Sequence, residues 1–158
     1  MGEILPPRES RLWADWVIFL RAYKAVTERI SQEMADNNLP TLVEYSVLYW
    51  LVNAEHHRLR QVDLSRGVLV SKSRVTRLMH SLVDQGFVRR EKTHADKRVT
   101  YAILTDRGQA AYDNATPVFS AAFSQFFANH IAPPDHGEVA RILLPMAEQT
   151  EGIHDVED

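Results

Sequence analysis

Apolar residues recur at helical spacing over the first quarter of the chain. This periodicity predicts a helix over residues 7–36, with Pro7 in the first turn, where its missing N–H is not needed. At 1.5 Å per residue the helix would be roughly 45 Å long, which is longer than one small domain can cover. Its apolar face is therefore expected to pack on a partner chain. The apolar positions are Leu12, Trp16, Phe19, Leu20, Tyr23, Val26, Ile30 and Met34.

A capping box marks the start of a second helix. Thr41 precedes an apolar run and Glu44 follows three residues later, so that each side chain can bond to the backbone N–H of the other. The pattern predicts a helix over residues 42–53. Its expected core positions are Tyr45, Leu48, Tyr49, Leu51 and Val52.

Two helices are predicted in the middle of the chain. The first covers residues 60–66 and ends at Gly67. The second is capped by Ser71 and reaches Gln85, where Gly86 ends it. Their closeness along the chain is typical of a helix-turn-helix unit.

Two short strands follow, over residues 87–92 and 98–104, and residues 93–97 form the tip between them. Together they predict a two-stranded β-wing. The fold class expected from these elements is mainly α, a winged helix-turn-helix with this wing and a helical scaffold.

The last part of the chain is predicted to be helical again. Thr105 caps a long helix over residues 106–130, which Pro117 should kink. Two prolines at 133–134 break the chain, and a last helix covers residues 135–149. We expect a single domain in which residues 7–55 and 105–150 form a helical scaffold that packs on a partner chain, and residues 56–104 form a separate lobe.

Composition narrows the class of protein. The 158 residues are 45% hydrophobic and 25% charged, which is typical of one globular domain. The chain has no cysteine, so disulfides, thiolate metal sites and thiol redox switches are excluded. Because we find neither a membrane-length apolar run nor a signal peptide, we expect a cytoplasmic protein that has no membrane partner.

Charge is distributed unevenly along the chain. Residues 56–107 hold 12 Lys and Arg against 5 Asp and Glu, a local charge of +7, whereas the remainder carries −10. A basic middle between acidic ends suggests a face that binds a polyanion.

The fourth predicted helix has the side chains for this role. Val75, Leu78, Met79 and Leu82 follow the spacing of a buried stripe, which leaves the opposite face polar. Such side chains donate to phosphates and base edges, and an α-helix fits the major groove. We therefore expect residues 56–104 to be a DNA-binding lobe, and residues 7–55 and 105–150 to be its dimerisation scaffold. The candidate DNA-binding residues of this helix are Ser71, Ser73, Arg74, Thr76, Arg77 and His80; those of the wing tip are His94, Asp96, Lys97 and Arg98.

The stretch 59–108 resembles the multiple-antibiotic-resistance regulator (MarR) family of bacterial transcription factors. The matching motifs are DLSRGVLVSKSRVTRLMHSLVDQGFVRR at 63–90, DKR at 96–98 and LTDRG at 104–108. The resemblance implies a homodimer, formed by the first, fifth and sixth helices, that binds a pseudo-palindromic operator in double-stranded DNA. It also implies that Arg98 is the wing arginine that enters the minor groove and that Asp96 is its partner.

The sequence predicts how the protein is controlled only in outline. We expect a repressor that a small aromatic or anionic effector releases from DNA, with Trp16, Tyr45, Tyr49 and Arg89 as pocket candidates. No cofactor is expected. His130 and His136 flank the proline pair, but their spacing does not show that metal ligands converge, so no metal site is predicted.

Alternative functions remain open at this stage. A helix-turn-helix dimer of this kind could act through protein partners, or bind DNA constitutively without an effector. An enzyme is not expected, because the chain has no phosphate-binding loop, nucleophile elbow, zinc-protease motif or dinucleotide fingerprint, and hence no catalytic residue is assigned.

Overall fold

The computed structural model describes residues 11–68, 72–92 and 99–151, and within these ranges the chain is mainly helical. The helices are α1 (Arg11–Asp36), α2 (Leu42–Val52), α3 (Gln61–Gly67), α4 (Lys72–Asp84), α5 (Asp106–Phe126) and α6 (Glu138–Glu151). The strands are β1 (Arg58–Arg60), β2 (Val88–Lys92) and β3 (Thr100–Leu104). Short 3₁₀ turns cover Glu55–His57, Ala128–His130 and Pro133–Asp135.

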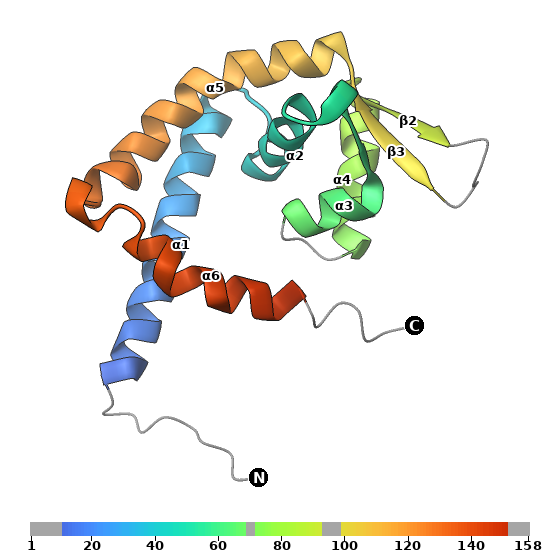
Figure 1. The fold of residues 1–158 in the computed structure, drawn as a ribbon. Coiled ribbons are helices and arrows are strands. Elements are labelled where there is room, and N and C mark those ends of the chain that lie inside the picture. Colours follow the sequence, from blue (N-terminus) through green and yellow to red (C-terminus); the bar gives the residue numbers. More distant parts are fainter. Residues whose placement is uncertain (1–10, 69–71, 93–98, 152–158) are drawn as a thin grey trace.

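The molecule divides visibly into two parts (Figure 1). The helices α1, α5 and α6 are here called the scaffold helices; α5 begins beside the strands and runs over α2 toward α1. The helices α3 and α4 lie with the three strands and form the part here called the lobe. α2 lies between the two parts, beneath the long α5.

The sheet of the lobe has three antiparallel strands in the order β1-β3-β2. The two strands of the predicted wing are present, and Val88 pairs with Leu104 at its base. β1 was not predicted: Arg58–Arg60 pairs with the other edge of β3, where Leu59 faces Ala102. Three residues are too few to show a strand period, so only the pairing reveals it.

Two clusters of buried side chains hold the fold together. The cluster of the lobe joins α2, α3, α4, β2 and β3 through Val47, Leu48, Leu51, Leu64, Val75, Met79, Leu82, Val88 and Ala102. The cluster of the scaffold joins α1, α2 and α5 through Ile30, Met34, Tyr45, Ala115 and Ala122. α2 contributes to both clusters, so it packs on the lobe as well as on the scaffold. The domain boundary predicted at residues 55/56 stays a prediction.

α2 begins as its sequence predicts. Thr41 is the N-cap, its side chain accepts from the Glu44 N–H at 3.3 Å, and the Glu44 carboxylate accepts from the Thr41 N–H at 2.9 Å. Tyr45, Leu48 and Leu51 are buried as expected. Tyr49 is not a core residue of the protomer, because 46% of it is exposed.

The C-terminal helices differ slightly from their predicted bounds. α5 starts at Asp106 behind the Thr105 N-cap, continues through Pro117 and ends at Phe126, four residues before the predicted end. It bends along its course in Figure 1. No helix in the described ranges combines the length and the apolar character needed to cross a membrane.

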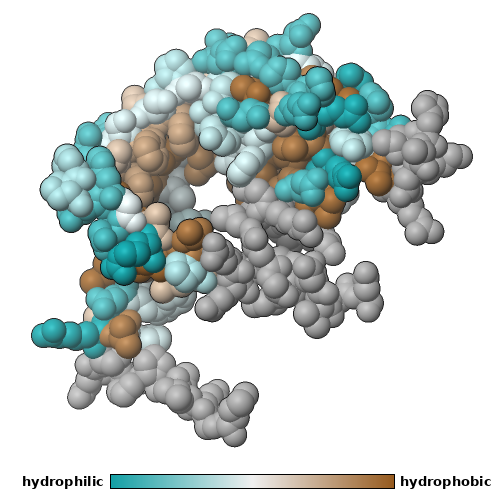
Figure 2. All heavy atoms as spheres, in the orientation of Figure 1, coloured by the Kyte–Doolittle hydropathy of each residue, from teal (hydrophilic) through white to brown (hydrophobic). Residues whose placement is uncertain are grey.

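The first half of α1 leaves large apolar side chains in contact with water, and brown apolar surface follows this helix in Figure 2. Burial on α1 is confined to Ile30 and Met34, near its end. The exposed apolar residues are Leu12, Trp13, Trp16, Ile18, Phe19, Leu20 and Tyr23. A surface of this kind is typical of a protein–protein interface.

Candidate nucleic-acid interface

α4 has the two faces that its sequence predicts. Val75, Met79 and Leu82 are buried in the cluster of the lobe, and Leu78 packs against them. Arg74, Thr76, Arg77 and His80 lie on the exposed side. The helix therefore presents two guanidinium groups, a hydroxyl and an imidazole on a rigid backbone.

Several predicted DNA-binding residues cannot be placed. Ser71 and the wing-tip residues His94, Asp96, Lys97 and Arg98 lie outside the described residues, as does the side chain of Ser73. β2 and β3 are described up to Lys92 and from Thr100, so the base of the wing is fixed beside α4.

A glycine turn ends α4. Gly86 has a φ of +73°, a conformation that favours glycine. The Phe87 N–H donates to the Leu82 carbonyl and the Gly86 N–H to the Val83 carbonyl, both at 2.9 Å. This pair of bonds is a Schellman motif, which turns the chain sharply from α4 into β2.

The LTDRG segment fixes this turn to the start of α5. The Thr105 hydroxyl donates to the Gly86 carbonyl at 2.6 Å and accepts from the Gly108 N–H at 3.0 Å. A Cβ on Gly108 would collide with the carbonyl oxygen of Phe87, so only glycine fits there. The motif is thus explained by the close approach of α5 to the glycine turn that follows α4.

A buried carboxylate forms a second connection to α4. Glu44 is 7% exposed, and its Oε1 accepts hydrogen bonds from Ser81 Oγ at 2.9 Å and Gln85 Nε2 at 2.6 Å. Burial raises the pKa of Glu44, but the hydrogen bonds from Thr41, Ser81 and Gln85 outweigh it and the pKa lies below its ordinary value. The group is therefore ionised at neutral pH.

The lobe carries further basic residues that the sequence analysis did not single out. Arg58 of β1 lies over the ring of Tyr101, 4.1 Å from its centroid. A hydrogen bond with Tyr101 raises the pKa of Arg60, which is exposed. Both arginines lie on β1, the strand that was not predicted, so no local sequence pattern indicated their position.

Two contacts of the wing strands concern predicted site residues. Arg90 of β2 contacts His80 of α4, with 3.4 Å between Nη1 and Nε2. Arg89, a candidate for the effector pocket, pairs with Glu91 at 3.0 Å on the surface. The Arg90–His80 contact thus joins β2 to α4 at the surface.

The four effector candidates lie on three different elements of the described chain, α1, α2 and β2. Tyr45 is buried between Tyr112 and Phe119, with ring centroids 5.3 and 4.5 Å away. Its pKa is raised, chiefly by burial. Trp16 lies on the exposed half of α1, and Tyr49 is half exposed on α2.

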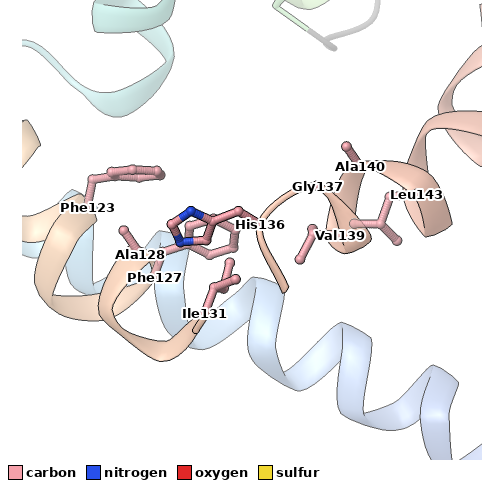
Figure 3. Close-up of a pocket in the computed structure, with 9 residues that line it drawn as sticks. All are labelled: Phe123, Phe127, Ala128, Ile131, His136, Gly137, Val139, Ala140 and Leu143. Atoms are coloured by element: carbon pink, nitrogen blue, oxygen red, sulfur yellow. The ribbon is translucent and has the colours of Figure 1, made fainter. Parts of the chain in front are cut away.

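A cleft of about 440 Å³ lies elsewhere, between the end of α5 and α6. Figure 3 shows rings from the α5 end and the 3₁₀ turns on one side and aliphatic side chains of α6 on the other. Its lining, Phe123, Phe127, Ala128, Ile131, His136, Gly137, Val139, Ala140 and Leu143, includes none of the four candidates. In the part of the chain that the structure describes, no three His, Asp or Glu side chains gather to hold a metal ion.

The fold and this site define a class of protein. A helix-turn-helix with an exposed Arg-bearing helix, flanked by a wing, is the architecture of winged-helix DNA-binding proteins. Comparisons with known proteins agree. Residues 39–99 match the sequence pattern of the MarR family.

Relatives extend the match over nearly the whole chain. The HTH-type transcriptional regulator YkoM of Bacillus subtilis, itself uncharacterised, is 33% identical over 138 residues, which are 87% of this chain and 83% of the relative. The chain belongs to the MarR family of transcriptional regulators.

Solved structures of this family superimpose closely. AbsC from Streptomyces coelicolor, a MarR family transcriptional regulator, has a TM-score of 0.84 at 27% identity and covers 96% of this chain and 99% of its own. Sco3205 of the same organism, solved in complex with DNA, has a TM-score of 0.84 at 24% identity over 92% of each chain. The family resemblance and the fold class predicted from the sequence are confirmed.

Proposed function

We propose that this MarR-family regulator represses transcription from a pseudo-palindromic operator, which it reads with α4 and the wing. The exposed face of α4 is the main observation in support of this proposal. Arg74 and Arg77 lie on this face, and the buried residues Val75, Met79 and Leu82 lie on the other. Arginine is the commonest reader of guanine edges in the major groove. Ser71, Ser73, Thr76 and His80 complete the proposed contacts of this helix.

The wing supplies the second set of proposed contacts. His94, Asp96, Lys97 and Arg98 form its tip, and we assign Arg98 to the adjacent minor groove, where a cation is attracted by the negative potential. Because the ligand is genomic DNA, we place the protein in the bacterial cytoplasm.

Two copies of the chain act together in this proposal. One recognition helix per protomer reads one half-site, and the exposed apolar half of α1 supplies a surface on which a second copy packs. Two-fold symmetry then sets the half-sites about one DNA turn, roughly 34–36 Å, apart.

The proposal includes a small-molecule effector. A planar aromatic or anionic molecule binds near Trp16, Tyr45, Tyr49 and Arg89, in a cleft that the second copy completes. It must favour a separation of the recognition helices that does not fit DNA, since equal affinity for both states shifts nothing. Peroxide should not release DNA, because the chain has no thiol.

The proposed function is tested by genomic pull-out followed by footprinting. Genomic fragments captured by the protein should share an inverted repeat, and footprinting should protect both of its halves. Arg98→Ala should weaken binding and flatten its salt dependence, because one cation is lost from the interface. Capture of fragments without any shared sequence would contradict the proposal, and capture of proteins without DNA would favour action through protein partners.

A further inference from the structure

The two carboxylate oxygens of Glu44 have separate partners. Oε2 accepts from the N–H and the hydroxyl of Thr41, both at 2.9 Å, and so completes the cap of α2. Oε1 accepts from Ser81 and Gln85, which lie near the end of α4. One buried charge thus ties the first turn of α2 to the last turns of α4.

The α2 end of this connection belongs to the scaffold. Tyr45, the next residue, is stacked on Tyr112 and Phe119 of α5 and lies 3.3 Å from Thr116 through its hydroxyl. These contacts fix the start of α2 against the long helix α5. A side chain that is hydrogen-bonded to the start of α2 is therefore held in position relative to the scaffold.

The α4 end of the connection is equally well defined. Gln85 Nε2 also donates to Ser81 Oγ at 3.0 Å, so the three side chains form a closed triangle of hydrogen bonds. Hydrogen bonds to a buried ionised group are stronger and more directional than those between neutral groups. Apolar packing of Met79 and Leu82 fixes how closely α4 approaches the rest of the lobe. Directional hydrogen bonds are needed to resist translation of α4 along its axis and rotation about it.

We propose that Glu44, through Ser81 and Gln85, is a positioning residue that sets the orientation of the recognition helix relative to the scaffold. The inference rests on the function proposed for α4. In a dimer, this orientation decides which separation of half-sites both recognition helices can fit. Loss of the Oε1 bonds should therefore relax the required separation as well as weaken binding.

The test compares variants on the two sides of the carboxylate. Ser81→Ala with Gln85→Met removes both donors to Oε1 and leaves the α2 cap intact. Thr41→Val is the matched control, because it removes the hydroxyl from the Oε2 side and leaves α4 untouched. Each protein is first shown to be folded by circular dichroism, and its Tm is measured.

Binding is then measured by fluorescence anisotropy on two duplexes. One is enriched by the wild-type protein from a randomised duplex library, and the other is the same duplex with one base pair inserted between its half-sites. The double variant should bind the enriched duplex about tenfold more weakly than the wild-type protein does. The ratio of its affinities for the enriched duplex and for the duplex with the inserted base pair should fall by a similar factor. Thr41→Val should lower the Tm and keep that preference.

The failures are distinguishable. A folded double variant with the wild-type preference overturns the inference alone and leaves the proposed function standing. A wild-type protein that enriches no duplex overturns both. If the double variant does not fold, Ser81→Ala and Gln85→Met are measured separately, and wild-type preference in both likewise overturns the inference.

Discussion

The lobe and the scaffold helices bury their apolar residues to different extents. In the cluster of the lobe, Met79 and Leu82 of α4 pack with Leu48 and Leu51 of α2, and all four side chains are fully buried within one chain. On the first half of α1, by contrast, Trp16 is 50% and Leu12 is 76% exposed. The lobe is complete in one protomer, whereas the scaffold has a surface that a second copy would cover.

This difference separates two kinds of mutational effect. A change in the cluster of the lobe acts on the stability of each protomer, and its cost does not depend on protein concentration. A change on the exposed half of α1 acts on association, and its cost does depend on concentration.

Leu51→Ala should have the largest effect. Leu51 is fully buried, so truncation leaves a cavity and lowers the free energy of unfolding by about 2–5 kcal/mol. Urea denaturation followed by circular dichroism measures the change. A loss below about 1 kcal/mol would show that the cluster of the lobe is less tightly packed than described.

Trp16→Ala should weaken association instead. Aromatic residues dominate protein interfaces, and truncation of a central one costs about 2 kcal/mol, roughly a 30-fold rise in the dimer dissociation constant. Sedimentation velocity over a dilution series measures this constant. Lys24→Ala is the control on the same helix, since its 3.7 Å ion pair with Glu28 is exposed and contributes little. Equal dimer dissociation constants for the two variants would argue against an interface on α1.

Arg77→Ala should weaken operator binding by about 1–3 kcal/mol if its guanidinium reads a base, and should relax sequence preference at one position of each half-site. Its effect on the Tm should be negligible, because the side chain is exposed. Arg141→Ala is a matched control, an exposed arginine of α6 that pairs with Glu138 at 2.7 Å. Equal affinities of the two variants would remove Arg77 from the interface.

The smallest effect concerns pH. The pKa of Glu44 is lowered in the folded protein, so the unfolded chain binds a proton more readily than the folded chain. The stability from this group is therefore complete above the ordinary value of 4.5 and is lost as the pH falls below it through the folded-state pKa. Glu44→Gln should flatten this part of the stability profile. A profile of unchanged steepness would assign the acid sensitivity to other carboxylates.

Local signals made most of the fold predictable. The Thr41–Glu44 box, Gly86 and the Thr105 cap each act within a few residues of the chain, and each element boundary that they predict lies within one or two residues of the observed one. The stripe on α4 likewise depends only on helical periodicity.

Features that depend on distant partners were not predictable. β1 is a strand only because Leu59 pairs with Ala102 of β3. The bond between Glu44 and Ser81 joins residues 37 apart, and no local pattern indicates it. Tyr49 satisfies helical spacing but lies on the exposed side of α2, since apolar periodicity marks faces that contact something without saying whether it is the same chain.

The central claim is that the scaffold helices of two protomers form one dimer interface, which sets the distance between the two lobes. Hydroxyl-radical footprinting, combined with a measured protein-to-duplex stoichiometry, tests this claim most directly. The account predicts two protected segments, related by an inverted repeat and centred about one DNA turn, roughly 34–36 Å, apart, with saturation at two protomers per duplex. A single protected segment saturated by one protomer would contradict it.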